Sequence, residues 1–245
     1  MRPILRKARA IFASRFSLMS AYRAEIIIWM LSGTVPLIMM AVWIGKAQTN
    51  GGAVGGFTPR DFAAYFLAAW LSQQLVVAWV SWALDDHIRQ GTLSPKLMRP
   101  LDVVWEFLTE HVAERVVRLP FVFLILTVGM LLVPGTHITP DLQHALAYVP
   151  CIGLAFAIRF LIAYCIGLLA FWFDQAIAID EFYFVISVFL SGGFAPLEFY
   201  PPVVRALVEW TPFPYVIYPC DLTVWRLSGI VSGRRLLFGG TIPPL

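Results

Sequence analysis

Charged residues are scarce in this sequence. Of its 245 residues, 13% are charged and 59% are hydrophobic, whereas a soluble domain is about one quarter charged. The mean hydropathy of +0.76 is that of a chain that contacts the lipid bilayer. A formal net charge of +3, dispersed along the chain, also excludes a nucleic-acid-binding protein. The composition therefore predicts an integral membrane protein with no nucleic-acid partner.

The sequence also lacks the motifs whose chemistry fixes the spacing of residues. It has no G-x-x-x-x-G-K-[ST] phosphate loop, no H-E-x-x-H, no C-x-x-C and no G-x-S-x-G. We therefore expect no catalytic residues, no metal site and no cofactor bound by this chain. In particular, the chain has no means of hydrolysing ATP by itself.

Five apolar segments are candidates for membrane-spanning helices. A span needs about 20 mostly apolar residues, because every backbone amide in hydrocarbon must form its hydrogen bond within the helix. The segments are residues 26–44, 62–84, 119–133, 145–173 and 182–197. The third reaches the required length when residues 116–118 are included. The predicted fold is therefore an all-α integral membrane domain with five clear spans.

Basic residues predict the orientation of these spans. Six Lys or Arg residues precede the first span and five lie between the second and third, whereas the loop after the first span has two and the loop after the third has none. Lys and Arg accumulate on the cytoplasmic side, so the N-terminus and residues 85–118 are predicted to be cytoplasmic. His87 and His111 then lie inside and His137 and His144 outside, which excludes a single site for all four.

The N-terminal residues have an amphipathic pattern. On a helical wheel Ile4, Ile11 and Phe12 share one arc, while Arg2 and Arg6 lie beyond its edge. Residues 1–20 are therefore predicted to form an interfacial helix; the alternative is a basic flank of the first span without an ordered helix. A compact apolar core followed by a small-residue cleavage site is missing, so we expect this segment to remain in the mature chain.

Residues 85–118 interrupt the apolar pattern with charge. Glycine and prolines up to residue 100 indicate short helices and bends. A helix with an apolar ridge should follow, because Val104, Leu108, Val112 and Val116 recur every four residues. Four acidic residues recur at the same interval: Asp102, Glu106, Glu110 and Glu114.

The acidic residues at this interval repel one another by a few tenths of a kcal/mol per neighbouring pair. Arg118 is placed to relieve Glu114 on the same helix. Three interpretations of the other acidic residues stay open. Their basic partner is the N-terminal helix, or it is a separate cytoplasmic protein, or the acidic face is solvated and needs no partner.

Three stretches of the sequence resemble bacterial ABC-2 type transporter permeases. IRQGTLSPKLMRPLD fits their I-R-x-G-x-L-x-x-x-L-x-R-P-L signature after the second span, and residues 167–176 and 191–218 are similar to two later stretches. The matching signature positions are Ile88, Arg89, Gly91, Leu93, Leu97, Arg99, Pro100 and Leu101. The resemblance covers about residues 20–228, and its three motifs occur in the expected order.

The resemblance implies one ABC-2 type, type V exporter-like transmembrane domain over residues 1–245. Such a domain has six spans after an interfacial helix, pairs with a second permease subunit as a homodimer or heterodimer, and works with separate ABC ATPase subunits that bind ATP and Mg. The implied function is export of a substrate across the bacterial inner membrane. Residues 88–101 would dock on the ATPase, with Ile88, Arg89, Gly91, Leu93, Lys96, Leu97, Arg99 and Pro100 as the coupling residues.

The resemblance also assigns residues 192–211 to short re-entrant helices on the extracytoplasmic side, where Pro196, Pro201 and Pro202 would form an outer gate. Arg159 lies near the middle of the fourth span, at a cost of about 2.5 to 3.5 kcal/mol in hydrocarbon. It lines the translocation route and meets an anionic group of the substrate, or forms a structural ion pair with Asp180 or Glu181, or snorkels to the interface after a shift of the helix.

The end of the sequence departs from the family pattern. Residues 219–245 contain Asp221, Arg226, Arg234 and Arg235 and no apolar run near 18 residues, so the sixth span is expected to be absent or atypical. Either the terminus is altered and stays outside, or residues 214–225 enter the membrane incompletely. A non-transporting scaffold or inactive partner subunit is therefore the alternative function. A secondary transporter is disfavoured, because its spans should carry more ion-coupling residues.

Overall fold

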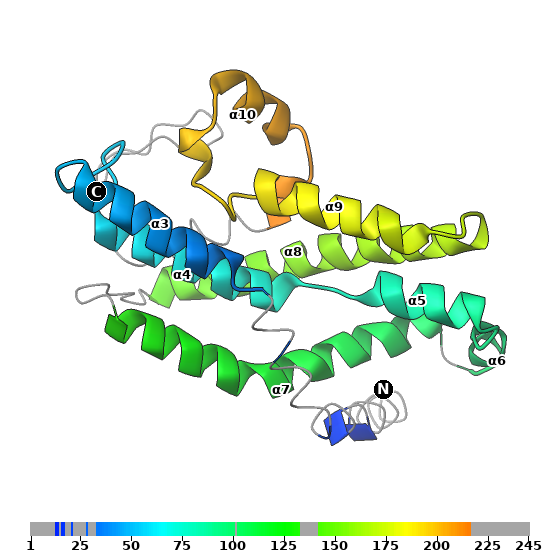
Figure 1. The fold of residues 1–245 in the computed structure, drawn as a ribbon. Coiled ribbons are helices and arrows are strands. Elements are labelled where there is room, and N and C mark those ends of the chain that lie inside the picture. The colour runs from blue at the N-terminus through cyan, green and yellow to red at the C-terminus, as the bar shows by residue number, and fades with distance from the viewer. Residues whose placement is uncertain are drawn as a thin grey trace. The chain divides into compact units, whose positions relative to one another are not determined.

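The structure, a computed structural model, describes residues 33–100, 102–132 and 142–216, and positions 13, 14, 16, 17, 21 and 28 before them (Figure 1). Positions 13, 14, 16 and 17 are helical. The rest of the interfacial helix predicted over residues 1–20 lies outside the described residues, as do residues 217–245, where the sixth span was in question. Within the described ranges the secondary structure is helical except for one isolated β-bridge between Val54 and Phe57, which confirms an all-helical chain.

The named elements of the described residues are eight α-helices and two short 3-10 helices. They are α3 (Val35–Thr49), α4 (Pro59–Val76), α5 (Val80–Arg89), α6 (Leu93–Leu97), α7 (Val103–Leu132), α8 (Leu142–Leu168), η1 (Leu169–Phe171), α9 (Ala176–Leu190), η2 (Leu197–Phe199) and α10 (Pro202–Glu209).

Three stretches of helix among the described residues are long and apolar enough to cross a membrane: Pro59–Arg89, Val103–Leu132 and Tyr148–Phe171. They correspond to the predicted second, third and fourth spans. The predicted first and fifth spans overlap α3 and α9, which have 15 residues each in the described chain, fewer than the roughly 20 that a span needs. These two spans therefore stay predictions.

The second span is not the continuous helix that the sequence predicted over residues 62–84. α4 ends at Val76 and α5 begins at Val80, with a non-helical stretch between them (Figure 1). The residues at the break, VVAWV, include neither proline nor glycine, which are the usual causes of a helix break. The sequence of this span therefore gave no signal of the interruption.

The chain divides into two compact units, each assembled from distant segments. The first unit consists of Met1–Ser32, Val77–Ile125 and Arg159–Tyr183, and the second of Gly33–Val76, Leu126–Ile158 and Phe184–Leu245. The first unit contains the whole polar interruption, and the second contains α3, α4 and α10. Helices α7, α8 and α9 each contribute residues to both units.

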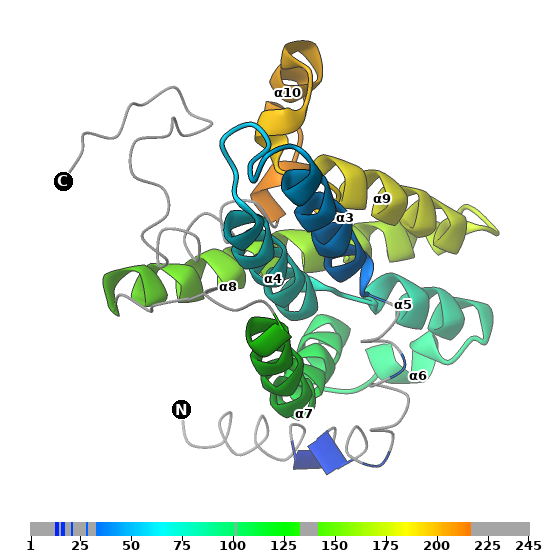
Figure 2. The same ribbon diagram turned by 60° about the vertical axis from the view of Figure 1, so that its left-hand side comes forward.

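Aromatic packing joins α3 and α4 in the second unit. The two helices lie side by side (Figures 1 and 2). Phe62 of α4 is fully buried and stacks on Trp43 of α3, with ring centroids 5.3 Å apart. Phe199 of η2 completes this cluster, with its ring centroid 4.9 Å from that of Trp43. The residues around the η2 turn are thereby fixed to the start of α4.

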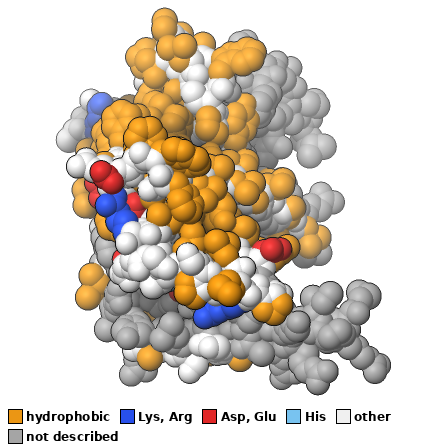
Figure 3. Space-filling model, turned by 90° about the vertical axis from the view of Figure 1, so that its right-hand side faces the viewer, with side chains coloured by type: hydrophobic (Ala, Val, Ile, Leu, Met, Phe, Trp, Pro, Cys, Tyr) orange, Lys and Arg blue, Asp and Glu red, His pale blue; other side chains and the backbone are white. Residues whose placement is uncertain are grey.

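The long helices differ in how much of their apolar surface is covered by the protein. The comparison uses an apolar segment of 18 residues in each helix. Of that segment 72% is buried in Pro59–Arg89, 17% in Val103–Leu132 and 28% in Tyr148–Phe171. Hydrophobic side chains dominate the face drawn in Figure 3, where charged ones are few. Exposed apolar side chains on α7 and α8, such as Leu131 and Leu154, suit contact with lipid or another membrane helix.

Candidate functional site

The predicted coupling residues form a tight turn and a short helix between α5 and α7. α5 ends at Arg89, and the chain reverses through Gly91, whose N–H donates to the Ile88 carbonyl at 3.2 Å. The φ of Gly91 is 70°, a value that an L side chain rarely adopts but that glycine adopts freely. Gly91 therefore allows α6 to follow directly after α5.

Charged side chains hold α6 against the start of α7. Lys96 Nζ donates to Glu106 Oε1 at 3.1 Å, and Arg99 Nη1 lies 3.8 Å from Glu106 Oε2. The Lys96 ammonium also lies 5.3 Å from the centroid of the buried Phe107 ring. The side chains of Lys96 and Glu106 are 12% and 11% exposed, so solvent screens this pair less than an ion pair on the surface.

A second set of contacts fixes the other end of α6. The His87 Nδ1 and Thr92 Oγ1 atoms are 2.7 Å apart, and the His87 ring centroid lies 5.9 Å from that of Phe107. Leu93, the first residue of α6, is buried. The turn and α6 are therefore attached to α5 and α7 at both ends.

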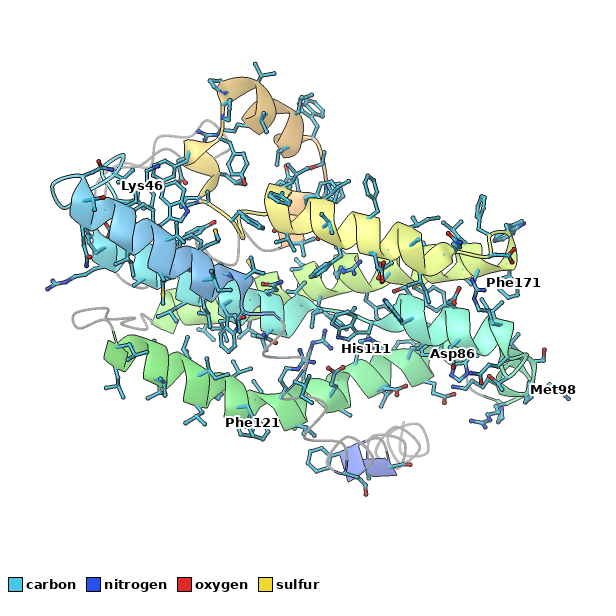
Figure 4. The ribbon with its side chains drawn as sticks, in the orientation of Figure 1. Lys46, Asp86, Met98, His111, Phe121 and Phe171 are labelled. Carbon is cyan, nitrogen blue, oxygen red and sulfur yellow. The ribbon has the colours of Figure 1, made fainter. Side chains whose placement is uncertain are left out.

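The outward surface of this element is apolar. Leu97 is 65% exposed and Met98 is 87% exposed, and Figure 4 shows Met98 pointing away from the helices. The Arg99 side chain beside them is 61% exposed. Met98 was not predicted as a coupling residue, because it occupies a variable position of the signature; its place between Leu97 and Arg99 was a usable signal.

The remaining predicted coupling residues differ in their exposure to solvent. Arg89 forms an ion pair with the buried Asp85 at 2.7 Å and keeps 45% of its side chain exposed. Ile88 is half-buried, whereas Gly91 and Pro100 are exposed. Leu101 lies outside the described residues. The eight coupling positions are thus brought together in one element, but Lys96 and Leu93 face the protein.

The acidic residues of α7 find partners within the chain itself. Glu106 pairs with Lys96 and Arg99, and Glu114 pairs with Arg118, as the sequence predicted for that second pair. The basic counterparts of Glu106 are therefore Lys96 of α6 and Arg99 just after it. This pairing differs from all three predicted counterparts: the N-terminal helix, a separate protein and solvent.

Arg159 lies in a buried polar network within the first unit. Its Nη1 and Nη2 atoms donate to Asp180 Oδ1 at 3.2 and 3.3 Å, and Ser81 donates to Asp180 Oδ2 at 2.7 Å. Arg159 and Asp180 are 6% and 2% exposed. The guanidinium also lies 4.9 Å from the Tyr183 ring centroid. The structure thus contains the ion pair with Asp180 that the sequence offered as the structural alternative.

Residues 192–211, the predicted extracytoplasmic segment, contain η2 and α10. Pro196 and Pro201 immediately precede these helices with φ values of −53° and −54°, and Pro202 occupies the first position of α10, where the missing N–H of proline costs no hydrogen bond. The three prolines therefore start helices rather than interrupt one.

Hydrogen bonds from α3 and α4 hold the chain just before η2. Trp43 Nε1 donates to the Phe194 carbonyl at 3.1 Å, and the Tyr65 hydroxyl donates to the Gly192 carbonyl at 2.8 Å. Tyr65 is buried. This irregular backbone is thus satisfied by protein side chains, as it must be wherever such a segment reaches membrane depth.

A protein-family model supports the sequence resemblance over most of the chain. The model of the ABC-2 family transporter protein matches residues 34–232. No curated protein and no solved structure matches the chain significantly. Among the described residues, no group of three His, Cys, Asp or Glu side chains is arranged to hold a metal ion. With its apolar spanning helices and this match, the chain belongs to the ABC-2 family of transporter proteins, as a multi-pass membrane permease.

Proposed function

We propose that the chain is the permease subunit of an ABC exporter in a bacterial inner membrane, with its N-terminus in the cytoplasm. Separate ATPase subunits, which bind ATP and Mg, dock on residues 88–101 and drive transport. A second permease subunit, identical or different, completes the membrane part. The observation that carries this proposal is the coupling element: a short helix fixed at both ends with an exposed apolar tip.

The tip suits a protein partner better than water. Complete burial of a leucine or methionine side chain contributes about 1.5 to 3 kcal/mol, and Leu97 and Met98 are both more than half exposed. Arg99 stands beside them with most of its side chain exposed, so it is available to a carboxylate of the partner. Lys96 does not suit that role, because its side chain is only 12% exposed and donates to Glu106.

α7 offers a direct mechanical connection from the docking element to the membrane. It is one helix of 30 residues from Val103 to Leu132, and therefore about 45 Å long. Glu106, near its start, holds α6 through Lys96. A force on α6 therefore reaches the apolar part of α7 through a single helix, without an intervening loop.

The proposal also gives roles to Arg159 and to the three prolines. Because Arg159 is buried and paired with Asp180, it meets an anionic group of a substrate only in a state where this pair has opened. Pro196, Pro201 and Pro202 shape the segment that closes the extracytoplasmic side of the route. Their positions at the starts of η2 and α10 favour a rigid turn there.

The decisive experiment is co-purification with an ABC ATPase that is expressed together with this chain. We expect a stable complex with wild type and loss of the ATPase, at unchanged permease yield, with Leu97→Glu and Met98→Glu. Leu207→Glu is the matched control, because Leu207 lies on α10 and is 67% exposed, close to the 65% of Leu97. Equal recovery of the ATPase with all three variants would exclude residues 88–101 as the docking element.

A further inference from the structure

The break between α4 and α5 lies inside the most buried of the long apolar stretches. Helical structure stops at Val76 and resumes at Val80, and Val76, Ala78 and Val80 are at most 2% exposed. Backbone groups released from a helix at such a place must find other partners, since neither lipid nor protein interior offers water. Two of these groups find partners in side chains of α7, within the same unit.

His111 accepts one of the released donors. The Trp79 N–H donates to His111 Nε2 at 2.9 Å. On the other side of the ring, His111 Nδ1 lies 2.8 Å from the Phe107 carbonyl, an acceptor, so Nδ1 carries the proton. Because Nε2 accepts and Nδ1 donates, the ring is neutral and its tautomer is fixed. Figure 4 shows His111 on the side of α7 that faces the break.

Arg115, one turn further along α7, binds the released acceptor. Its guanidinium donates to the Val77 carbonyl through Nη2 and to the His111 carbonyl through Nη1 at 2.7 Å. The first bond connects α7 to the break, and the second fixes the arginine to its own helix. His111 and Arg115 thus satisfy one donor and one acceptor on either side of Ala78.

The residues at the break do not themselves require it. Val, Ala and Trp are all compatible with a helix, and the cost of valine and tryptophan there is below 1 kcal/mol each on the scale where proline costs about 3. In a continuous helix Trp79 N–H would bond the Leu75 carbonyl, and the Val77 carbonyl would accept from the Ser81 N–H. Closing the helix would therefore replace the two side-chain bonds with backbone bonds, among them these two.

We propose that His111 and Arg115 are a clamp that holds the second span open at residues 77–79, and that this stretch switches between a broken and a continuous helix. Because the Trp79 N–H and the Val77 carbonyl have a partner in either arrangement, the stretch makes a bistable element, the kind that conformational changes use. Side chains inserted into a helix ladder are a recognised cause of such breaks.

Contacts hold the start of α5, so the backbone itself changes conformation at residues 77–79. Ser81 donates to the buried Asp180, and a Cβ added to Gly167 of α8 would lie 3.0 Å from Ser81 Cα. Along the chain, the break separates α4 from the α5 helix that leads to the coupling element. This last consequence rests on the proposed function, whereas the clamp itself does not.

Distances between two spin labels test the clamp directly. The labels are placed on Arg60→Cys and Asp86→Cys, both exposed, after the three native cysteines are replaced by serine or alanine. In a continuous helix the two labelled Cα atoms are about 39 Å apart. We expect His111→Leu and Arg115→Met to shift the distance distribution towards one narrow population at that length.

Two conservative variants serve as matched controls. Glutamine at position 111 keeps an acceptor near Nε2, and lysine at 115 keeps one donor, so His111→Gln should reproduce the wild-type distribution and Arg115→Lys should fall between. Size-exclusion profiles identify variants that have not folded; the Gln and Lys variants then carry the comparison. The proposal is wrong if wild type is already centred at the continuous length, or if the Leu and Met variants match wild type.

The test of the clamp does not depend on the proposed function. The distance measurement needs no ATPase and no substrate, so it reports on the clamp even if residues 88–101 bind nothing. Conversely, retention of the ATPase by His111→Leu, with the distance shift present, would support both. Loss of the ATPase docking in the Leu97→Glu test would leave the clamp result unaffected.

Discussion

Lys96 and Glu106 form an ion pair at 3.1 Å that attaches the short helix α6 to the first turn of α7. Ten residues separate them in the sequence, so the pair closes the loop that carries the proposed docking surface. Both side chains are mostly buried, which makes each dependent on the other, because an unpaired charge at such a site is costly.

Removal of either charge should loosen the docking element. We expect Lys96→Met and Glu106→Gln each to destabilise the closed loop by about 1 to 3 kcal/mol, the usual range for a lost hydrogen bond to a charged group. The exchange variant Lys96→Glu with Glu106→Lys should recover part of that loss. Protease sensitivity of residues 88–101 in detergent measures the effect, and equal sensitivity of wild type and Lys96→Met would contradict it.

Gly91 should be required for its backbone conformation rather than for its small size. Nothing lies within 4 Å of a Cβ added there, but its φ is +70°, which costs an L side chain about 1 to 2 kcal/mol. Gly91→Ala should therefore weaken recovery of the ATPase. Gly153→Ala on α8 is the control: it also has open space, without a positive φ, and should raise the thermal stability slightly.

Variants of the buried pair of Arg159 and Asp180 can distinguish a structural role of Arg159 from a role in transport. Removing one partner should lower the free energy of unfolding by about 3 to 5 kcal/mol, because the other charge stays buried. Arg159→Leu and Asp180→Asn should both show this as a lower melting temperature in detergent, and Arg159→Met combined with Asp180→Leu should recover much of it.

Transport by the double variant then decides between the two roles. If the arginine lines the translocation route, the stabilised double variant should fold but fail to transport. Wild-type transport by that variant would leave Arg159 with a structural role alone. The control is Ser81→Ala, which removes the hydrogen bond to Asp180 but keeps both charges.

A close contact of Gly55 should make the segment around η2 sensitive to one added methyl group. A Cβ on Gly55 would lie 2.7 Å from the Phe199 ring, and the φ of Gly55 is +56°. Gly55→Ala should displace η2 from the aromatic cluster and destabilise the second unit. Adding Phe199→Leu should remove the steric part of the loss but not the backbone part. No loss of thermal stability in Gly55→Ala would contradict this packing.

Hydropathy and spacing were sufficient to predict the helical class, the family and three helices that are long and apolar enough to cross a membrane. These features depend on composition averaged over many residues, or on a signature of fixed spacing. The first half of α7 could also be predicted, because Val104 and Val112 belong to an apolar ridge with a spacing of four residues. That ridge leads into the apolar second half of the same helix.

Contacts between distant residues explain what the sequence could not predict. The break at residues 77–79 is absent from the local sequence, because His111 and Arg115, more than 30 residues away, supply its hydrogen bonds. The partner of Glu106 was missed for a related reason: Lys96 was considered as a residue for the ATPase rather than for its own chain.

Orientation in the membrane is the prediction on which the docking proposal most depends, and single cysteines can test it. Met98 is 87% exposed and should face the cytoplasm, whereas Ala53, also exposed, lies in the loop after the first span and should face outwards. In a chain without its native cysteines, a membrane-impermeant maleimide added to intact spheroplasts should label Ala53→Cys and leave Met98→Cys unlabelled. Opening the membrane should make both reactive at similar rates, since both positions are exposed. Labelling of Met98→Cys in intact spheroplasts would put α6 on the side away from any cytoplasmic ATPase. The positive-inside distribution of Lys and Arg would then have failed for this chain, and the exposed apolar tip would need a different partner.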